Sequence, residues 1–295
     1  MSEIIKDTLI DGIKLLPFLF ITYLLMEYIE HKMKHKSRET IKKSGRFGPL
    51  FGSLLGVFPQ CGFAVSATNL YAGRVITLGT LIAVYLSTSD EMLPIFISEA
   101  VSPIAILKIL GLKLIIGIIA GFLIDFIMNL LNKGKLKHKE NNVDDIAEEG
   151  IEHMCDEEHC HCNENGILKS TLKHTFSIFV YIIIITFIIN IVVHFIGEEN
   201  IANLLLDKPI LGPVISALIG LIPNCAASVI ITNMYLQNVI SFGSMMAGLL
   251  TGAGVGLAVL FKTNNNIKEN VKIIGLLYFL GILSGIIIEA IGVIV

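Results

Sequence analysis

Long apolar runs alternate with short polar segments along most of the chain. Four runs approach or exceed the roughly 20 residues that a helix needs to cross a bilayer: residues 9–28, 104–131, 176–196 and 271–295. Two further apolar stretches in each half are interrupted by proline, glycine and polar residues. The pattern therefore predicts an all-α polytopic membrane protein in which some helices are broken or shorter than a bilayer.

The composition points the same way. Hydrophobic residues make up 54% of the 295 residues, charged residues only 16%, and the mean hydropathy is +0.75. Soluble domains carry about 25% charged residues, so the balance argues against a soluble protein with deeply buried helices. The chain has no phosphate-binding P-loop, and direct drive by ATP is not expected. We also expect no nucleic-acid partner.

The two halves of the chain are copies of one sequence unit. A shift of 164 residues aligns them without a gap, and fifteen of the thirty-nine positions from 48 to 86 are then identical. Shared apolar bias produces scattered Leu and Ile matches, but it does not readily match Pro, Cys, Asn and Gly. The matched positions include Pro59/Pro223, Cys61/Cys225, Thr68/Thr232, Asn69/Asn233, Gly117/Gly281, Gly121/Gly285 and Asp125/Glu289. We predict two repeats, at residues 1–131 and 169–295, joined by a linker at residues 132–168.

The lysine and arginine residues predict that the repeats are inverted. Cytoplasmic loops are enriched in these residues. Residues 32–46 hold seven of them, whereas the matching loop 197–208 holds one lysine and three acids. Residues 98–103 have no basic residue, whereas 262–272 have three lysines. Paired loops thus fall on opposite sides, which predicts an inverted-topology repeat with both termini outside and the central loop cytoplasmic.

Inversion requires an odd number of crossings in each half. Two alternatives satisfy this condition in the first half. One is a re-entrant hairpin over residues 47–72 followed by a single crossing, and the other is three short crossings.

The most specific motifs are Pro-Gln-Cys-Gly at residues 59–62 and Pro-Asn-Cys-Ala at residues 223–226. Proline removes a backbone donor and disfavours helix in the residue before it. Glycine permits any backbone conformation. We therefore predict broken helices or hairpins at these Pro-x-Cys motifs, next to a cavity at mid-membrane depth. The expected break residues are Pro59, Gly62 and Pro223, the soft ligands Cys61 and Cys225, and the amide ligands Gln60 and Asn224.

A simpler interpretation of each motif is a proline kink beside a cysteine that packs as a small apolar residue. Thr68, Asn69, Thr232 and Asn233 follow the motifs. They either line the cavity and bind substrate or hydrogen-bond to neighbouring helices. The sequence leaves these two roles open.

Carboxylates inside apolar runs are costly and mark candidate functional sites. Asp90 and Glu91 interrupt such a run in the first half and have no acidic counterpart in the second. They could bind a cation or carry a coupling proton, or the turn could lie in water at the outer surface. Asp125 and Glu289 match each other in the last span of each half. Asp125 is a candidate for coupling, and Glu289 is expected near the membrane surface.

The central linker has a different chemistry. Residues 140–164 hold ten acids and neither lysine nor arginine. Thiolate and imidazole ligands favour Zn²⁺, Cu⁺ and similar ions, but the spacing is not that of a folded zinc finger. We expect a disordered acidic linker that collects metal through His153, Cys155, His159, Cys160, His161 and Cys162.

Three motifs, in this order and spacing, resemble a bacterial family of ten-span heavy-metal exporters. They are FPQCGF at residues 58–63, STSDEMLP at 87–94 and IPNCAAS at 222–228. The family is related by name to arsenic-efflux permeases and is also labelled as manganese transporters. The resemblance implies ten spans in the plasma (inner) membrane and a transport function.

Together these features predict an ion- or proton-coupled exporter of a metal or metalloid that works by alternating access. Its partners are the lipid bilayer and the metal substrate, it needs no cofactor, and a homo-oligomer remains open. The first rival is a transporter of a small organic solute or anion with structural cysteines. The others are a membrane-embedded metalloenzyme, for which no H-E-x-x-H motif is present, and a metal sensor.

Overall fold

The described part of the chain is entirely helical. The computed structural model describes residues 16–17, 20–21, 24, 47–58, 61–89, 92–133, 171–172, 175–177, 179–184, 187–188, 191 and 211–292, with only the backbone of residues 61, 225 and 226. These ranges contain no β-strand. The predicted all-α class is therefore confirmed for them.

The helices of the two halves begin at matching positions. The first half contains α3 (Gly48–Gly56), α4 (Cys61–Ala72), α5 (Leu78–Ser87), α6 (Met92–Ser98) and α7 (Pro103–Lys133). The second half contains α12 (Leu211–Gly220), α13 (Cys225–Leu236), α14 (Phe242–Thr251), α15 (Val255–Thr263) and α16 (Ile267–Ile291). At the offset of 164 residues, each first residue falls within one position of its counterpart.

Equivalent local sequences start the central helix of each half. The Thr77 hydroxyl accepts the backbone N–H of Thr80 at the start of α5, at 3.1 Å. The Ser241 hydroxyl accepts the N–H of Ser244 at the start of α14, at 3.2 Å. Side-chain caps of this kind satisfy amides that a helix leaves unpaired at its first turn.

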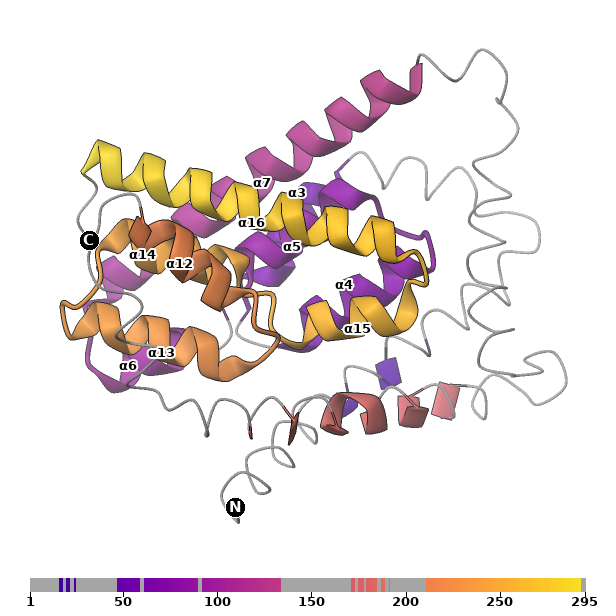
Figure 1. The fold of residues 1–295 in the computed structure, drawn as a ribbon, viewed down its shortest axis with the longest axis horizontal. Coiled ribbons are helices and arrows are strands. Elements are labelled where there is room, and N and C mark those ends of the chain that lie inside the picture. The colour runs from indigo at the N-terminus through magenta and orange to yellow at the C-terminus, as the bar shows by residue number, and fades with distance from the viewer. Residues whose placement is uncertain are drawn as a thin grey trace, which may run out of the picture.

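Each central helix lies between two neighbours of its own half. Helix α5 packs against α3 and α7, and α14 packs against α12 and α16 (Figure 1). Glycines make the close approach possible. A Cβ atom at Gly121 of α7 would lie 2.7 Å from both the Gly79 carbonyl oxygen and Pro49 Cβ. Small residues let apolar helices approach closely where no water drives them together.

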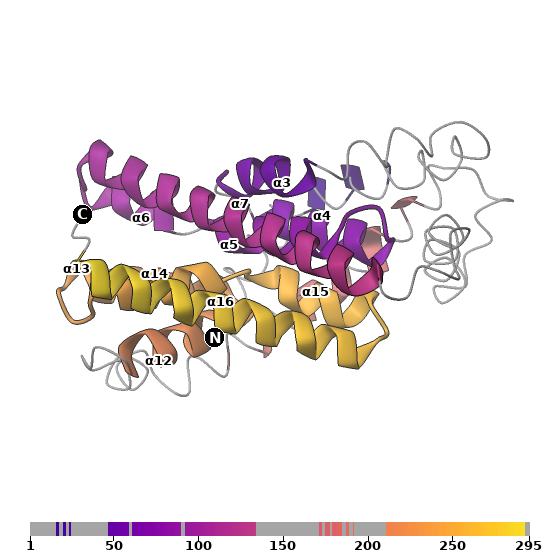
Figure 2. The same ribbon diagram turned by 90° about the horizontal axis from the view of Figure 1, so that it is seen from above.

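Helices of one half also pack against helices of the other half. Helix α4 of the first half packs against α15 of the second, and α13 packs against α6. Both ribbon views place α4 with α15 toward one end of the molecule and α6 with α13 at the other (Figures 1 and 2). Helices α7 and α16 run in nearly opposite directions along the long axis (Figure 2).

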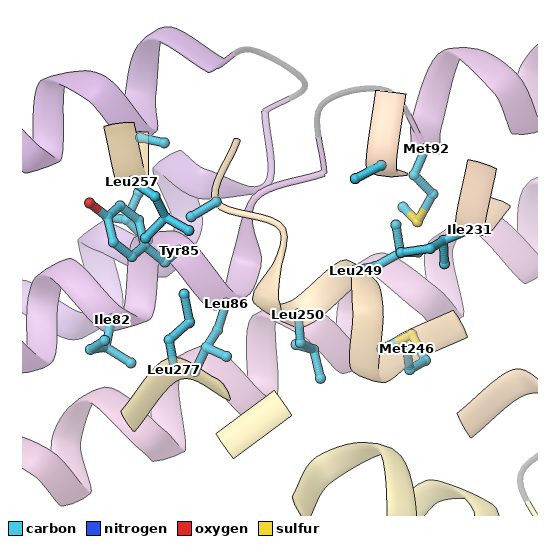
Figure 3. Close-up of a cluster of buried hydrophobic side chains, with 14 of the residues drawn as sticks. Ile82, Tyr85, Leu86, Met92, Ile231, Met246, Leu249, Leu250, Leu257 and Leu277 are labelled. Carbon is cyan, nitrogen blue, oxygen red and sulfur yellow. The ribbon is translucent and has the colours of Figure 1, made fainter. Parts of the chain in front are cut away.

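One apolar cluster joins the halves at the centre. Tyr85 and Leu86 of α5 meet Leu249 and Leu250 of α14 in a cluster that also contains Leu257 of α15 (Figure 3). All five side chains are buried. The contact surface between the halves is therefore a continuous core.

By length and composition, four segments of the described chain can cross a membrane: Leu78–Ser98, Pro103–Leu131, Phe242–Thr263 and Ile267–Ile291. The first and third are broken helices that lie mostly inside the protein, whereas α7 and α16 are mostly exposed. Exposed apolar side chains such as Ile119 and Phe126 of α7 fit contact with lipid. The structure therefore supports a polytopic membrane protein.

The close approach of α7 to α5 gives a test of the packing. We expect Gly121→Ala to lower the free energy of unfolding by about 1–3 kcal/mol, because the added methyl overlaps the Gly79 carbonyl oxygen and the Cβ atoms of Pro49 and Ala83. Gly111 is a matched control on the same helix, since a Cβ atom there meets nothing within 4 Å. Gly111→Ala should leave stability unchanged or slightly raised. Denaturant titration in mixed micelles measures both, and equal effects of the two changes would contradict this packing.

Candidate functional site

A small buried cavity lies where broken helices of both halves meet. Its volume is about 10 Å³, roughly room for one water. Its walls come from the α5–α6 and α14–α15 breaks, the α12–α13 tip and α7. The lining residues are Thr88, Ser89, Met92, Lys113, Gly220, Asn224, Ser228, Leu249, Gly252 and Gly254.

The cavity forms because two helices stop inside the protein. Helix α5 ends at Ser87, and its capping residue Thr88 turns out of helical geometry with ψ 130°. Helix α14 ends at Thr251, and Gly254 has a positive φ of 52° before α15 begins. A helix end leaves carbonyl oxygens without intrahelical partners. The cavity is therefore bordered by polar backbone groups inside an apolar interior.

Asp90 and Glu91 lie in the sequence between the end of α5 and the start of α6. Both acids lie outside the described residues. Their neighbours Ser89 and Met92 are buried, and the Ser89 hydroxyl donates to the Val57 carbonyl at 2.8 Å. The roles considered for Asp90 and Glu91 therefore stay predictions.

Lys113 is a site residue that the sequence reasoning missed. Its side chain is 0% exposed, and its Nζ donates to the carbonyl oxygens of Thr88 and, at 2.9 Å, Leu249. The signal was a lysine in the interior of an apolar run, which marks a candidate functional residue in a membrane protein. Leu277 occupies the equivalent position in the second half.

Thr68 contacts neighbouring helices. Its hydroxyl shares a 2.6 Å hydrogen bond with the Tyr85 hydroxyl, and both oxygens lie within 3.3 Å of the Gly256 carbonyl oxygen. These contacts join α4, α5 and α15. Thr68 and Thr232 also share a contact within their own helices, to the carbonyls of Ala64 and Ser228, each at 2.7 Å. Neither threonine lines the cavity.

Asn69 is buried without a hydrogen-bond partner among the described residues. Its side chain is 0% exposed, yet neither its Oδ1 nor its Nδ2 is paired. Buried amides are nearly always hydrogen-bonded, so an unpaired one calls for a ligand, a water or an ion. The equivalent Asn233 is exposed. The copies therefore differ at this position.

Asp125 and Glu289 both bind the start of a central helix. Asp125 Oδ1 accepts the N–H of Gly79 at 2.9 Å, and Oδ2 accepts the Thr77 hydroxyl at 2.7 Å. Glu289 Oε2 accepts the N–H of Gly243 at 3.0 Å. A carboxylate at a helix N-terminus pairs free amides and complements the helix dipole. These contacts give both acids a structural role.

An ion pair joins the halves at the end of the molecule near α4 and α15. Arg74 Nη1 and Nη2 donate to Glu269 at 2.8 and 3.0 Å, and the Tyr71 hydroxyl donates to the same carboxylate. The Glu269 carboxylate raises the pKa of the Arg74 guanidinium by accepting these hydrogen bonds. The equivalent positions hold Asn238 and Ala105, which cannot form an ion pair.

Comparison with known proteins identifies the family. The sequence model of the ArsP_2 family, described as "Putative, 10TM heavy-metal exporter", matches residues 1–197 and 163–293 in two overlapping segments. The chain belongs to this family. No curated protein and no solved structure matches it. Family membership confirms the resemblance drawn from the motifs. It supports membrane localisation and heavy-metal transport in general, and it points away from an enzyme.

The structure brings only some of the predicted site residues together. Asn224 lines the cavity with Thr88 and Ser89, so this residue of the second Pro-x-Cys motif lies beside the break between α5 and α6. Pro223 directly precedes Asn224, and Gly62 is buried in the first turn of α4. No three His, Cys, Asp or Glu side chains gather within the described ranges.

The remaining predicted site residues stay predictions. They lie outside the described residues or have undescribed side chains: Pro59, Gln60, Cys61, Asp90, Glu91, His153, Cys155, His159, Cys160, His161, Cys162 and Cys225.

Replacing Asn69 tests whether its unpaired amide serves metal transport and not the stability of the fold. Asn69→Leu removes two unsatisfied buried atoms at similar size. We expect unchanged stability or a gain of about 1–2 kcal/mol, together with loss of heavy-metal tolerance in cells that depend on this protein. Thermal unfolding and growth on metal measure the two effects.

Asn233→Leu is the matched control for stability, because Asn233 is exposed. It should leave the unfolding temperature unchanged. A clear loss of stability in Asn69→Leu would show that the amide is bonded, and would contradict its assignment as an unpaired group.

Substitutions at Asp125 can separate its helix-capping role from the predicted role in proton coupling. Asp125→Asn keeps an oxygen that accepts the Gly79 N–H, so we expect retained metal tolerance and nearly unchanged stability. Asp125→Ala should cost about 1–3 kcal/mol, because the amide then lacks its partner. Glu289→Gln and Glu289→Ala form the matched pair. Loss of tolerance in the folded Asp125→Asn variant would instead identify Asp125 as a proton carrier.

Proposed function

We propose that this chain is a secondary transporter that exports a heavy-metal or metalloid ion by alternating access between two inverted repeats. One observation carries the proposal: broken helices from both halves meet at a buried cavity in a member of a heavy-metal exporter family. In secondary transporters, substrate and coupling-ion sites lie near the bilayer midplane where discontinuous helices of two repeats meet.

The arrangement of the elements supports inversion. Equivalent helices recur at the same offset, and the long helices α7 and α16 run in nearly opposite directions (Figure 2). The Arg74–Glu269 pair joins the α4–α5 turn to the start of α16. Lysines at residues 262–272 assign that end to the cytoplasm under the positive-inside rule.

Helix lengths favour re-entrant hairpins over three short crossings in each half. Helices α3 and α4 have 9 and 12 residues. At 1.5 Å per residue they are about 14 and 18 Å long, well short of a hydrocarbon core of about 30 Å. A description with ten spans fits the same chain if each hairpin arm counts as one span.

One of the proposed substrate ligands, Asn224, lines the cavity. Cys225 is the next residue in the sequence. We assign Cys61 and Cys225 as thiolate ligands, Gln60 and Asn224 as amide ligands, and Asp90 and Glu91 as charge or coupling groups. Thiolates select soft ions such as Cd²⁺, Zn²⁺ or trivalent arsenic species. The Cys and His residues of the central linker would collect metal on the cytoplasmic side.

A second candidate is a transporter of a small anion or organic solute with structural cysteines. One observation favours it: a lysine, Lys113, lines the cavity, and cations there attract anions. The family description favours the metal instead.

Transport by the purified protein separates the two candidates. In proteoliposomes with an imposed pH gradient, we expect the wild type to move at least one of Zn²⁺, Cd²⁺, Mn²⁺ or arsenite. The double variant Cys61→Ser/Cys225→Ser should lose about tenfold or more of soft-metal transport while still folding, since hydroxyls are poor ligands for soft ions.

A triple variant of the linker, Cys155→Ser/Cys160→Ser/Cys162→Ser, is the matched control. It removes thiols outside the proposed site and should retain transport at saturating metal. Unchanged metal transport in the double variant would remove the thiolate ligands from the mechanism. No transport of any of these ions by the wild type would favour the anion or organic solute.

A further inference from the structure

Lys113 lies in the interior of a helix that is long and apolar enough to cross a membrane. It is the eleventh residue of α7, about 15 Å from the start of that helix. Its side chain is fully buried. Neighbours such as Ile115 and Ile119 are exposed apolar residues on the lipid-facing part of the same helix. A buried ammonium in such a helix requires strong oxygen partners.

Two of its partners are carbonyl oxygens at the C-terminal ends of broken helices. Thr88 is the capping residue of α5, and Leu249 lies in the last turn of α14. The Lys113 ammonium donates to the carbonyl oxygen of each residue. The last carbonyls of a helix lack intrahelical donors and carry the negative end of the helix dipole. One such end comes from each half of the chain.

Carbonyl ends of this kind form cation sites. In transporters with broken helices, unwound backbone carbonyls and half-helix C-termini coordinate the coupling cation. We propose that the Lys113 ammonium is a tethered cation that occupies a monovalent-cation site formed by the ends of α5 and α14. The site takes no free cation in the wild type, and it admits a small monovalent cation once the side chain is shortened.

Within the described residues, the second half does not repeat the site. The equivalent of Lys113 is Leu277, which is fully buried in the apolar cluster between the halves (Figure 3). The cavity beside Lys113 leaves room for a small ion. Because the inference concerns ion binding alone, it stands or falls independently of which substrate the protein transports.

Shortening the side chain tests the proposal. In purified full-length protein in detergent with choline chloride, we expect Lys113→Ala to lower the apparent melting temperature by roughly 5 °C or more, since two buried carbonyls lose their partner. Replacing choline with ammonium, methylammonium or sodium at equal ionic strength should recover at least half of that loss, and the recovery should saturate with concentration.

The controls isolate the site from general salt effects. Lys108 is an exposed lysine on the same helix, so Lys108→Ala and the wild type should respond equally to all four salts. Lys113→Met fills the space without a charge and should be destabilised without recovery. A Lys113→Ala variant as stable as the wild type, or one that no small cation stabilises relative to choline, would overturn the proposal.

A second variant decides the question if Lys113→Ala does not fold. Lys113→Gln keeps a hydrogen-bond donor of similar reach but no charge. It should melt below the wild type and show no recovery in small cations, because the amide fills the site. A wild-type melting temperature for Lys113→Gln would show that a neutral donor suffices, and would overturn the assignment of a cation site.

Discussion

Backbone groups that a helix leaves unpaired must find partners when the helix begins or ends in an apolar interior. In a bilayer, an unsatisfied N–H or C=O costs several kcal/mol, and no water is present to replace the missing bond. Helices α5 and α14 end inside this protein, so the constraint applies to both of them. Their starts are paired by Thr77 with Asp125 and by Ser241 with Glu289. Their ends are joined by the ammonium of Lys113.

The packing of the neighbouring helices follows from these fixed ends. A carboxylate on α7 reaches the start of α5 only if the two helix axes lie close together, and the same holds for α16 and α14. Gly121 and its equivalent Gly285 provide that approach, because a Cβ atom at either would lie within 3 Å of a carbonyl oxygen of the facing helix. The matched glycines and acids of the two halves thus act together. The glycine sets the distance between the two helix axes, and the acid caps the start of the central helix.

Periodicity and charge predicted the fold class, and the matched motifs predicted the family. Apolar runs and lysine content are local properties of a sequence, so one chain is enough to read them. The break after Ser87 was harder to see, because that copy has neither proline nor glycine there. Polar residues at 87–91 interrupt the run in the first copy, and the equivalent Gly252 and Gly254 mark the break in the second. The capping role of Asp125 could not be predicted, since its partner Gly79 lies 46 residues away in the sequence.

Lys113 was overlooked for a related reason. Lys113 is one of two lysines in the run from 104 to 131 and hardly changes its hydropathy. Its role depends on two carbonyls that are 25 and 136 residues away. Asn69, unlike Lys113, was recognised as a candidate from the sequence. Its match with Asn233 marked it in the sequence, but only the structure shows that one copy is buried and unpaired while the other is exposed.

Under the proposed alternating access between inverted repeats, the differences between the halves have energetic consequences. Two identical repeats would make the inward- and outward-open states equal in energy, so every unmatched residue shifts the balance between them. Arg74 and Glu269 are 35% and 23% exposed. A pair of this kind contributes about 0–1 kcal/mol, which changes a two-state ratio by at most roughly fivefold.

Lys113 has a larger effect than this surface pair, because its two carbonyl partners belong to different halves and are buried. Any rearrangement that separates the ends of α5 and α14 must leave one buried carbonyl without its donor, at about 1–3 kcal/mol. The lysine therefore constrains the relative motion of the halves more strongly than the surface ion pair does.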